Sequence, residues 1–157
     1  MTTTPDPTTV SGPELVITRV FEAPHDLVFA AWTDLDQLAV WSGPTGFTIP
    51  SVDGDLQPGG AWRMCMTSEQ HGTFWCHGVW CEIAPPERLV FTTAWEDPNG
   101  GPEHEMLVTV TFADLGGTTE MTFHQAAFIH EQSRDSHDDG WSACFDKLAV
   151  HLAGVAS

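Results

Sequence analysis

The sequence has very few basic residues and no tyrosine. Lysine and arginine together number 5 against 22 aspartate and glutamate residues, which gives a formal net charge of −17 with neutral histidines. A charge of this sign repels the phosphates of nucleic acids and the head groups of anionic lipids. We therefore expect neither nucleic acid nor an anionic membrane surface as a partner.

Long apolar runs and targeting signals are also missing. No stretch approaches the roughly 18 uninterrupted apolar residues of a membrane-spanning helix. The N-terminal MTTTPDPTTVSGP lacks the basic and then apolar pattern of a secretion signal. We expect a soluble, cytoplasmic protein without membrane insertion.

Cysteine spacing excludes the common metal and redox motifs. The four cysteines, Cys65, Cys76, Cys81 and Cys144, show no CxxC pattern, and with no sign of secretion they indicate reduced, mostly buried thiols. Cys76 and Cys81 fall on opposite faces of one extended strand, which makes them poor ligands for a shared metal.

The length and composition suit one domain. A chain of 157 residues with 41% hydrophobic residues is large enough to bury a core. Residues 1–12 are mostly Thr, Pro, Asp, Ser and Gly, which predicts a disordered tail. The predicted folded domain covers residues 13–157.

The first part of this domain changes from a strand to helices. ELVITRVFEAP, from Glu14 to Pro24, predicts a strand that stops at the proline. Residues 25–41 carry apolar side chains at spacings of three and four, which predicts one or two short helices. Thr33 followed by Asp34 suits a new N-cap, so we expect a break there.

From Phe47 onward the hydrophobic period becomes two, with Gly, Pro, Asn and Asp between the runs. This pattern predicts successive antiparallel strands. The predicted strands are residues 47–53, 60–67, 73–83, 88–96, 104–113 and 117–126.

The final segment predicts one amphipathic helix. Ser133 or Ser136 suits its start and Gly154 its end. Its single apolar stripe consists of Trp141, Cys144, Phe145, Leu148 and Leu152.

Large apolar residues share one face of most predicted strands. In RLVFTTAW the large side chains Leu89, Phe91 and Trp95 fall on the same side. That face needs a cover, and the C-terminal helix is the one long amphipathic element left. The same parity groups Trp62, Met64 and Met66; Val79, Cys81 and Ile83; Met106, Val108, Val110 and Phe112; and Met121 and Phe123.

We therefore predict an α+β fold, in which a strongly curved antiparallel sheet wraps around the C-terminal helix and two short helices close one end. Seven Trp, nine Phe and five Met residues would give large apolar walls, which suit an apolar guest. The alternative is that these side chains simply fill one another's gaps. Periodicity alone leaves both readings open.

Several segments resemble one family. They are ITRVFEAPHDLVFAAWTD, LAVWSGPTGF, GGAW, HGVWCEIAPPERLVFTTAW, VTVTFADLGGTTEMTF and GWSACFDKLAVHL. Their order over residues 14–154 is similar to the C-terminal domain of the heat-shock protein 90 ATPase activator family, within the START-like or SRPBCC superfamily. APPERLVFT and the GW that opens the last helix are the most distinctive parts.

The resemblance implies a helix-grip fold with an internal hydrophobic cavity between the sheet and the C-terminal helix. Superfamily members bind lipids, sterols, hormones or polyketides, and a few are cyclases or hydrolases. The namesake stimulates a chaperone and carries an additional N-terminal docking domain. Only a short tail precedes the domain here, so we do not expect a chaperone partner. The family also admits a homodimer.

The eight histidines match no metal-binding pattern. His124, His130 and His137 could meet only through a loop near Asp138 and Asp139, and strand parity turns His124 away from the face of Met121 and Phe123. We expect surface histidines and no metal. No GxSxG motif or glycine-rich phosphate loop occurs, and we expect no cofactor.

His77 has the parity of Val79 and Cys81, which predicts that it points into the interior. There it could contact a ligand or act as an acid or base, and the alternative is a hydrogen-bonded core histidine. Glu82 and Arg88 flank the double proline, and we interpret them as a clamp on the turn.

Three functions remain open from the sequence. The first is binding of a small apolar or amphipathic molecule. The second is a protein-interaction role, as a chaperone adaptor or regulator, through the outer sheet face with an exposed Trp80. The third is an enzyme of the cyclase or hydrolase type that uses His77 and a water. The predicted ligand-contacting residues are Trp62, Met64, His77, Phe91, Trp95, Met106, Val108, Phe123, Trp141 and Phe145, with Trp32 and the loop WSGPTGF (residues 41–47) beside them.

Overall fold

The computed structural model describes residues 13–96, 105–126 and 131–156. The predicted tail, residues 1–12, lies outside these ranges. The elements are β1 (Leu15–Phe21), α1 (His25–Thr33), α2 (Leu35–Trp41), β2 (Thr48–Gly54), β3 (Ala61–Ser68), β4 (Gly72–Ala84), β5 (Arg88–Trp95), β6 (Met106–Asp114), β7 (Thr119–Ala126) and α3 (Glu131–Ala156).

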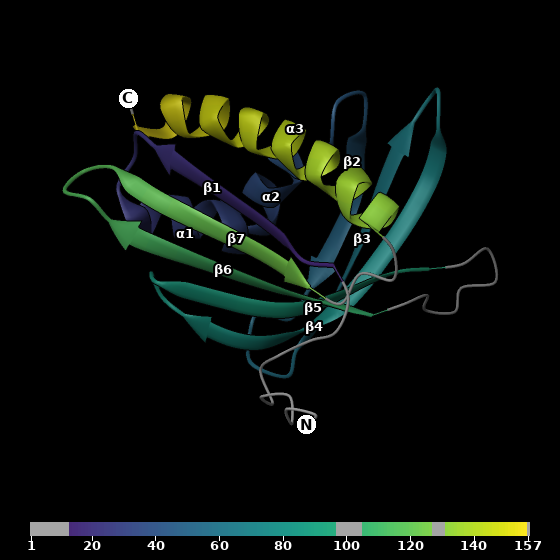
Figure 1. Ribbon diagram of the computed structural model, residues 1–157, viewed down its shortest axis with the longest axis horizontal. Helices are drawn as coiled ribbons and strands as arrows, with labels where there is room; N and C mark the ends of the chain where they lie inside the picture. Colours follow the sequence, from purple (N-terminus) through teal and green to yellow (C-terminus); the bar gives the residue numbers. More distant parts are fainter. Residues whose placement is uncertain (1–12, 97–104, 127–130, 157) are drawn as a thin grey trace, which may run out of the picture.

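The seven strands form one antiparallel sheet in the order β1-β7-β6-β5-β4-β3-β2. Figure 1 shows this sheet curving around α3, with α1 and α2 inside the curve at one end. The predicted α+β helix-grip architecture is confirmed. None of the helices in the described part of the chain is both long and apolar enough to cross a membrane.

The break between the two short helices is where the sequence predicts it. Asp34 stands between α1 and α2, and its Oδ1 accepts a hydrogen bond from the backbone N–H of Asp36 at 3.0 Å. Hydrogen bonding, first from the Gln37 side chain, lowers the pKa of the Asp34 carboxyl. The side chain therefore caps the new helix in its ionised form.

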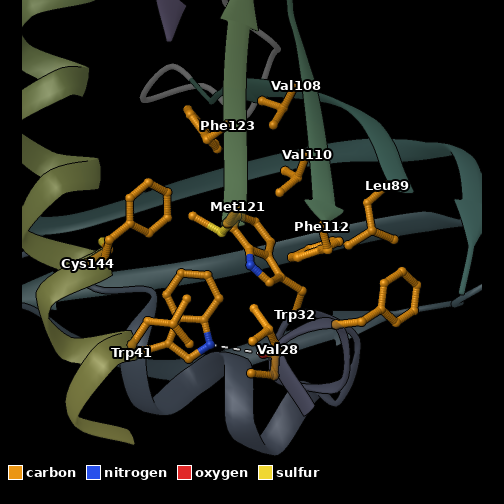
Figure 2. Packing of buried hydrophobic residues seen from close by; sticks show 14 of the residues in the cluster. Val28, Trp32, Trp41, Leu89, Val108, Val110, Phe112, Met121, Phe123 and Cys144 are labelled. Atoms are coloured by element: carbon orange, nitrogen blue, oxygen red, sulfur yellow. Dashed lines mark hydrogen bonds between the residues drawn. The ribbon is translucent and has the colours of Figure 1, made fainter. Parts of the chain in front are cut away.

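A packed aromatic core fills the end of the grip beside α1 and α2. The ring of Trp32 lies 4.7 Å from that of Trp41 and 6.3 Å from that of Phe123, measured between centroids. Trp41 Nε1 donates a hydrogen bond of 2.9 Å to the carbonyl oxygen of Ala31 (Figure 2). Because this buried donor is satisfied, Trp41 can be fully enclosed.

The predicted apolar stripe of α3 is confirmed, but its predicted ends are wrong. Cys144, Phe145, Leu148 and Leu152 are buried and Trp141 packs against the same core. The helix already includes Glu131 and continues to Ala156, so Ser133, Ser136 and Gly154 lie within it. Packing of the stripe stabilises the helix by more than the roughly 1 kcal/mol that an internal glycine costs.

Because of an irregularity in β4, the side chains in the first half of this strand point to the face opposite to the predicted one. Trp80 pairs with Phe91 and Glu82 with Val90, which leaves Cys81 as the extra residue of a bulge. The bulge shifts the side-chain phase by one residue. Trp80 is therefore 4% exposed and points inward, whereas Val79 is 39% exposed.

Three sequence predictions fail because of this bulge. His77 and Val79 do not share the interior face with Ile83, Trp80 is not exposed, and Cys81 is an exposed thiol. The bulge lies just before the turn whose clamp is confirmed, since Arg88 Nε and Glu82 Oε2 are 3.2 Å apart. Both side chains of the clamp are about half exposed, and such a pair contributes little to stability.

Gly78 gives a test of how β4 packs. A Cβ at this position would overlap the backbone carbonyl of Thr92 and lie 2.7 Å from Trp62 Nε1. We expect Gly78→Ala to lower the free energy of unfolding by about 1–3 kcal/mol, measured by urea denaturation. Gly140→Ala in α3 is the matched control. A Cβ there meets nothing within 4 Å, and we expect it to be neutral or stabilising by about 0.5–1 kcal/mol. Equal effects of the two substitutions would contradict this packing.

Candidate functional site

A pocket of about 490 Å³ lies between the concave face of the sheet and the N-terminal half of α3. Its wall comes from α1 and α2, the loop that follows α2, strands β2 to β5, β7 and α3. The C-terminal half of α3 instead covers the packed core, where Leu148 and Leu152 are buried. The interior of the grip is therefore divided into a filled end and a hollow end.

Five of the predicted ligand-contacting residues lie on this wall. They are Trp62, Met64, Phe91, Trp95 and Trp141. Trp32, which the sequence places beside them, also lines the pocket while its ring belongs to the core. Their predicted contact with a guest stays a prediction.

The other predicted contacts lie elsewhere. Met106, Val108, Phe123 and Phe145 point inward as their parity indicates, but they are at most 5% exposed and belong to the packed core behind the wall. His77 is on the opposite, outer face of the sheet, in an open depression beside Asp53 and Arg63. Strand parity separates inward from outward residues but does not say where along the grip the interior is filled.

Several wall residues are not among the predicted contacts. The sequence predicts the wrong face for Trp80, because the bulge in β4 has no sequence signature. Gln125 continues the inward parity of Met121 and Phe123 along β7, so the same pattern identifies it. Ser42, Pro44 and Phe47 come from the loop that the sequence places beside the contacts, and Met66 and Cys144 belong to its inward-facing groups. The remaining ones come from strands, helices and the end of β5: Leu35, Leu38, Val52, Phe74, Cys76, Thr93, Glu96, Ser136, His137 and Gly140.

Two hydrogen bonds join the polar groups of the wall. Trp141 Nε1 donates to Gln125 Oε1 at 2.8 Å, and Trp95 Nε1 donates to His137 Nε2 at 3.0 Å. Because Nε2 of His137 accepts, that nitrogen carries no proton in this arrangement. These pairs connect α3 to β7 and β5, so the hydrogen bonds that position the wall also hold the helix on the sheet.

The loop between α2 and β2 is fastened by one ammonium group. Lys147 Nζ on α3 donates to the carbonyl oxygens of Gly43, Pro44 and Phe47 at 2.6, 3.2 and 3.4 Å. Pro44 and Phe47 line the pocket, and the Phe47 ring stacks on His71 with a centroid distance of 5.8 Å. Phe47 of this loop thus lies at the pocket, whereas Trp41 at its start belongs to the core.

His77 belongs to a charged cluster on the outer face. Arg63 donates from Nε and Nη2 to the two carboxylate oxygens of Glu96 at 2.8 Å each, and His77 Nδ1 lies 3.1 Å from Glu96 Oε2. The Arg63 guanidinium also lies 3.9 Å from the centre of the Trp75 ring. Trp75 therefore belongs to the outer face together with Arg63, and His77 has no access to the pocket.

The same cluster lowers the pKa of Glu96 to about 2. Hydrogen bonds from Arg63 are the largest cause, partial burial opposes them, and the contact with His77 adds to the lowering. The Glu96 side chain is only 7% exposed. Its carboxylate is therefore committed to the outer face, although the residue also borders the pocket.

Burial raises the pKa values of two thiols on the wall, those of Cys76 and Cys144, to about 12. The Cys144 thiol also donates to the carbonyl oxygen of Ser42 at 3.2 Å. Neither thiol has the thiolate character that a nucleophile needs. No group of three His, Cys, Asp or Glu side chains within the described ranges could hold a metal ion, and His130 lies outside those ranges.

Comparison with known proteins gives a family and a set of similar folds. The family described as activator of Hsp90 ATPase homolog 1-like protein matches residues 22–153. A solved protein from Chromobacterium violaceum is 25% identical, with a TM-score of 0.80, over 90% of this chain and 98% of that chain. The AHSA1 protein from Silicibacter pomeroyi is 24% identical, with a TM-score of 0.82 and the same coverage.

A protein from Arthrobacter aurescens is 22% identical, with a TM-score of 0.79, over 94% of this chain and 92% of that chain. At such identities the structural likeness concerns the fold. A comparison with curated proteins finds no match.

Thiol labelling tests the burial of the wall. In the native protein at pH 7.5 we expect one cysteine, Cys81, to react quickly with a thiol reagent, and all four to react in denaturant, because only Cys81 is exposed. The Cys81→Ser variant should lose the fast reaction and is the control. Fast reaction of Cys76 or Cys144 in that variant would show that the wall opens to solvent.

The pKa of Glu96 can be followed by carboxyl NMR during an acid titration. Since the folded pKa is about 2 against an ordinary 4.5, Glu96 stabilises the fold fully above about pH 4.5 and loses this contribution as the pH falls toward 2. Arg63→Gln should raise the titration midpoint toward 4.5. His77→Gln should raise it less, and a wild-type midpoint near 4.5 would contradict the pairing.

Proposed function

The chain belongs to the family of activator of Hsp90 ATPase homolog 1-like proteins, and on that premise we propose that it binds a small apolar or amphipathic molecule in the pocket beneath α3. Membership alone does not select this function. The pocket itself, in a chain with an otherwise well-packed interior, supports the proposal.

The size and lining of the pocket carry this proposal. A volume of about 490 Å³ falls within the range of small-molecule sites, roughly 300–1,000 Å³. Five tryptophan rings take part in the wall, namely Trp32, Trp62, Trp80, Trp95 and Trp141. Rings of this size supply a large apolar surface at little conformational cost.

Burial of apolar surface would drive the binding. At about 25 cal/mol per Å², each ~55 Å² of apolar guest surface removed from water corresponds to about a tenfold gain in affinity, before the cost of association. The hydrogen-bonded pairs Trp141–Gln125 and Trp95–His137 hold the wall in place without a guest. A preformed wall lowers the ordering cost of binding.

Neither alternative function has comparable support. The protein-interaction hypothesis required an exposed Trp80, but this ring is buried. The hydrolase-type hypothesis required His77 in the interior, but its imidazole lies on the outer face with Glu96. The pocket is thus the feature on which a function can be built.

Native mass spectrometry of protein purified without detergent is the direct test. We expect a retained apolar adduct, or a small molecule identified after organic extraction, and quenching of tryptophan fluorescence when it is added back. A clean apo mass, together with no thermal shift across a panel of lipids and polyketides, would contradict the proposal.

Gly140 allows the pocket to be filled from the helix. It lines the pocket, and a Cβ there meets nothing within 4 Å. Gly140→Phe should therefore weaken binding at least tenfold while the protein stays folded. Gly140→Ala, which takes up little of the volume, should bind nearly as well as the wild type.

A further inference from the structure

We propose that Gln125 makes the pocket selective for an uncharged guest that carries a hydrogen-bond acceptor such as a carbonyl oxygen. This inference rests on the proposed ligand-binding function and adds to it the chemical class of the guest. Gln125 lies on β7, is 1% exposed and borders the pocket. It is a buried carboxamide in a wall that is otherwise mostly apolar.

The partners of Gln125 fix the orientation of its carboxamide. The indole N–H of Trp141 can only donate, so the group 2.8 Å away must be the side-chain oxygen. Nε2 then faces the thioether of Met106, with an N–S distance of 3.4 Å. A flipped amide would place two donors against each other and leave the oxygen beside the sulfur.

This orientation leaves a donor unsatisfied. The NH₂ group has two N–H bonds, and one of them meets a weak sulfur acceptor. The described residues offer the other no acceptor. A buried donor without a partner is costly, so a guest that presents an acceptor there gains more than the same guest without one.

Other unsatisfied groups of the wall are donors as well. Within the described ranges, the buried side-chain nitrogens without a hydrogen-bond partner are Nε1 of Trp32, Trp62 and Trp80, and all three rings line the pocket. Trp62 Nε1 lies against Gly78 on β4, so it belongs to the back of the wall. The buried side-chain groups of the described wall that lack a partner are thus donors.

The charges around the pocket disfavour an ionised guest. The described lining residues include no lysine or arginine, so an anionic group would find no counter-charge. Among the described lining residues Glu96 is the one that carries a carboxylate, and its oxygens are already bound by Arg63 and His77. A cationic guest would therefore find no free carboxylate among the described lining residues. An uncharged guest with a hydrogen-bond acceptor needs neither a cationic nor an anionic partner in the wall.

The experiment compares three guests of matched shape by calorimetry: the ketone acetylnaphthalene, the hydrocarbon isopropenylnaphthalene and the anion naphthoate. In the wild-type protein we expect the ketone to bind about fivefold to tenfold more tightly than the hydrocarbon, and naphthoate to bind most weakly. Gln125→Met keeps the side-chain length without the amide, and should make the ketone and the hydrocarbon bind equally well.

Thr93→Val is the matched control, because it removes another polar group of the wall and should leave the preference for the ketone intact. The NMR signals of the Gln125 side-chain amide in the wild-type protein give a readout that needs no variant. They should shift with the ketone more than with the hydrocarbon.

Equal wild-type affinity for the ketone and the hydrocarbon would overturn the role of Gln125 and leave the proposed function standing. A preference that persists in folded Gln125→Met would do the same. Failure of all three guests to bind would overturn the proposed function and this inference together.

Discussion

The burial of one helical stripe governs this fold. Cys144, Phe145, Leu148 and Leu152 must leave water together, and the concave face of the sheet is the surface that covers them. The sheet therefore curves around the helix, as Figure 1 shows, and α1 and α2 close the end where the side chains meet most tightly. The rest of the architecture follows from how far along the helix this packing extends.

Packing does not extend along the whole helix. Around Trp32 the aromatic rings lie within about 6 Å of one another and leave little space. Toward the N-terminal half of α3 the pocket opens, and hydrogen bonds of Trp95 and Trp141 tie its wall to the helix. One set of aromatic residues thus builds both a rigid core and an open pocket. The stability of the core allows the pocket to stay unfilled.

Sequence patterns predict the fold well, because burial and capping select particular residue types at regular positions in the chain. The alternation along β5, β6 and β7 identifies their inward faces, and the capping residue Asp34 marks the break between the helices. The face of β4 was not predictable, since one extra residue at Cys81 shifts the phase. The filled and hollow parts were also inaccessible, because they depend on side-chain volumes summed over many elements. Phe123 and Trp62, for example, both point inward from their strands, but Phe123 lies in the packed core and Trp62 lines the pocket.

The bulge in β4 has a consequence for how the sequence can vary among relatives. The hairpin from β3 to β4 and the hairpin from β4 to β5 demand opposite side-chain phases, and the residue at position 81 reconciles them. Loss or gain of a single residue within β4 would move the inward-facing side chains of one hairpin to the outer face of the sheet, while those of the other hairpin stay inside. Length changes in this lineage should therefore collect in the turns, while β4 keeps a constant number of residues and the side chain at position 81, which points to solvent, is free to diverge.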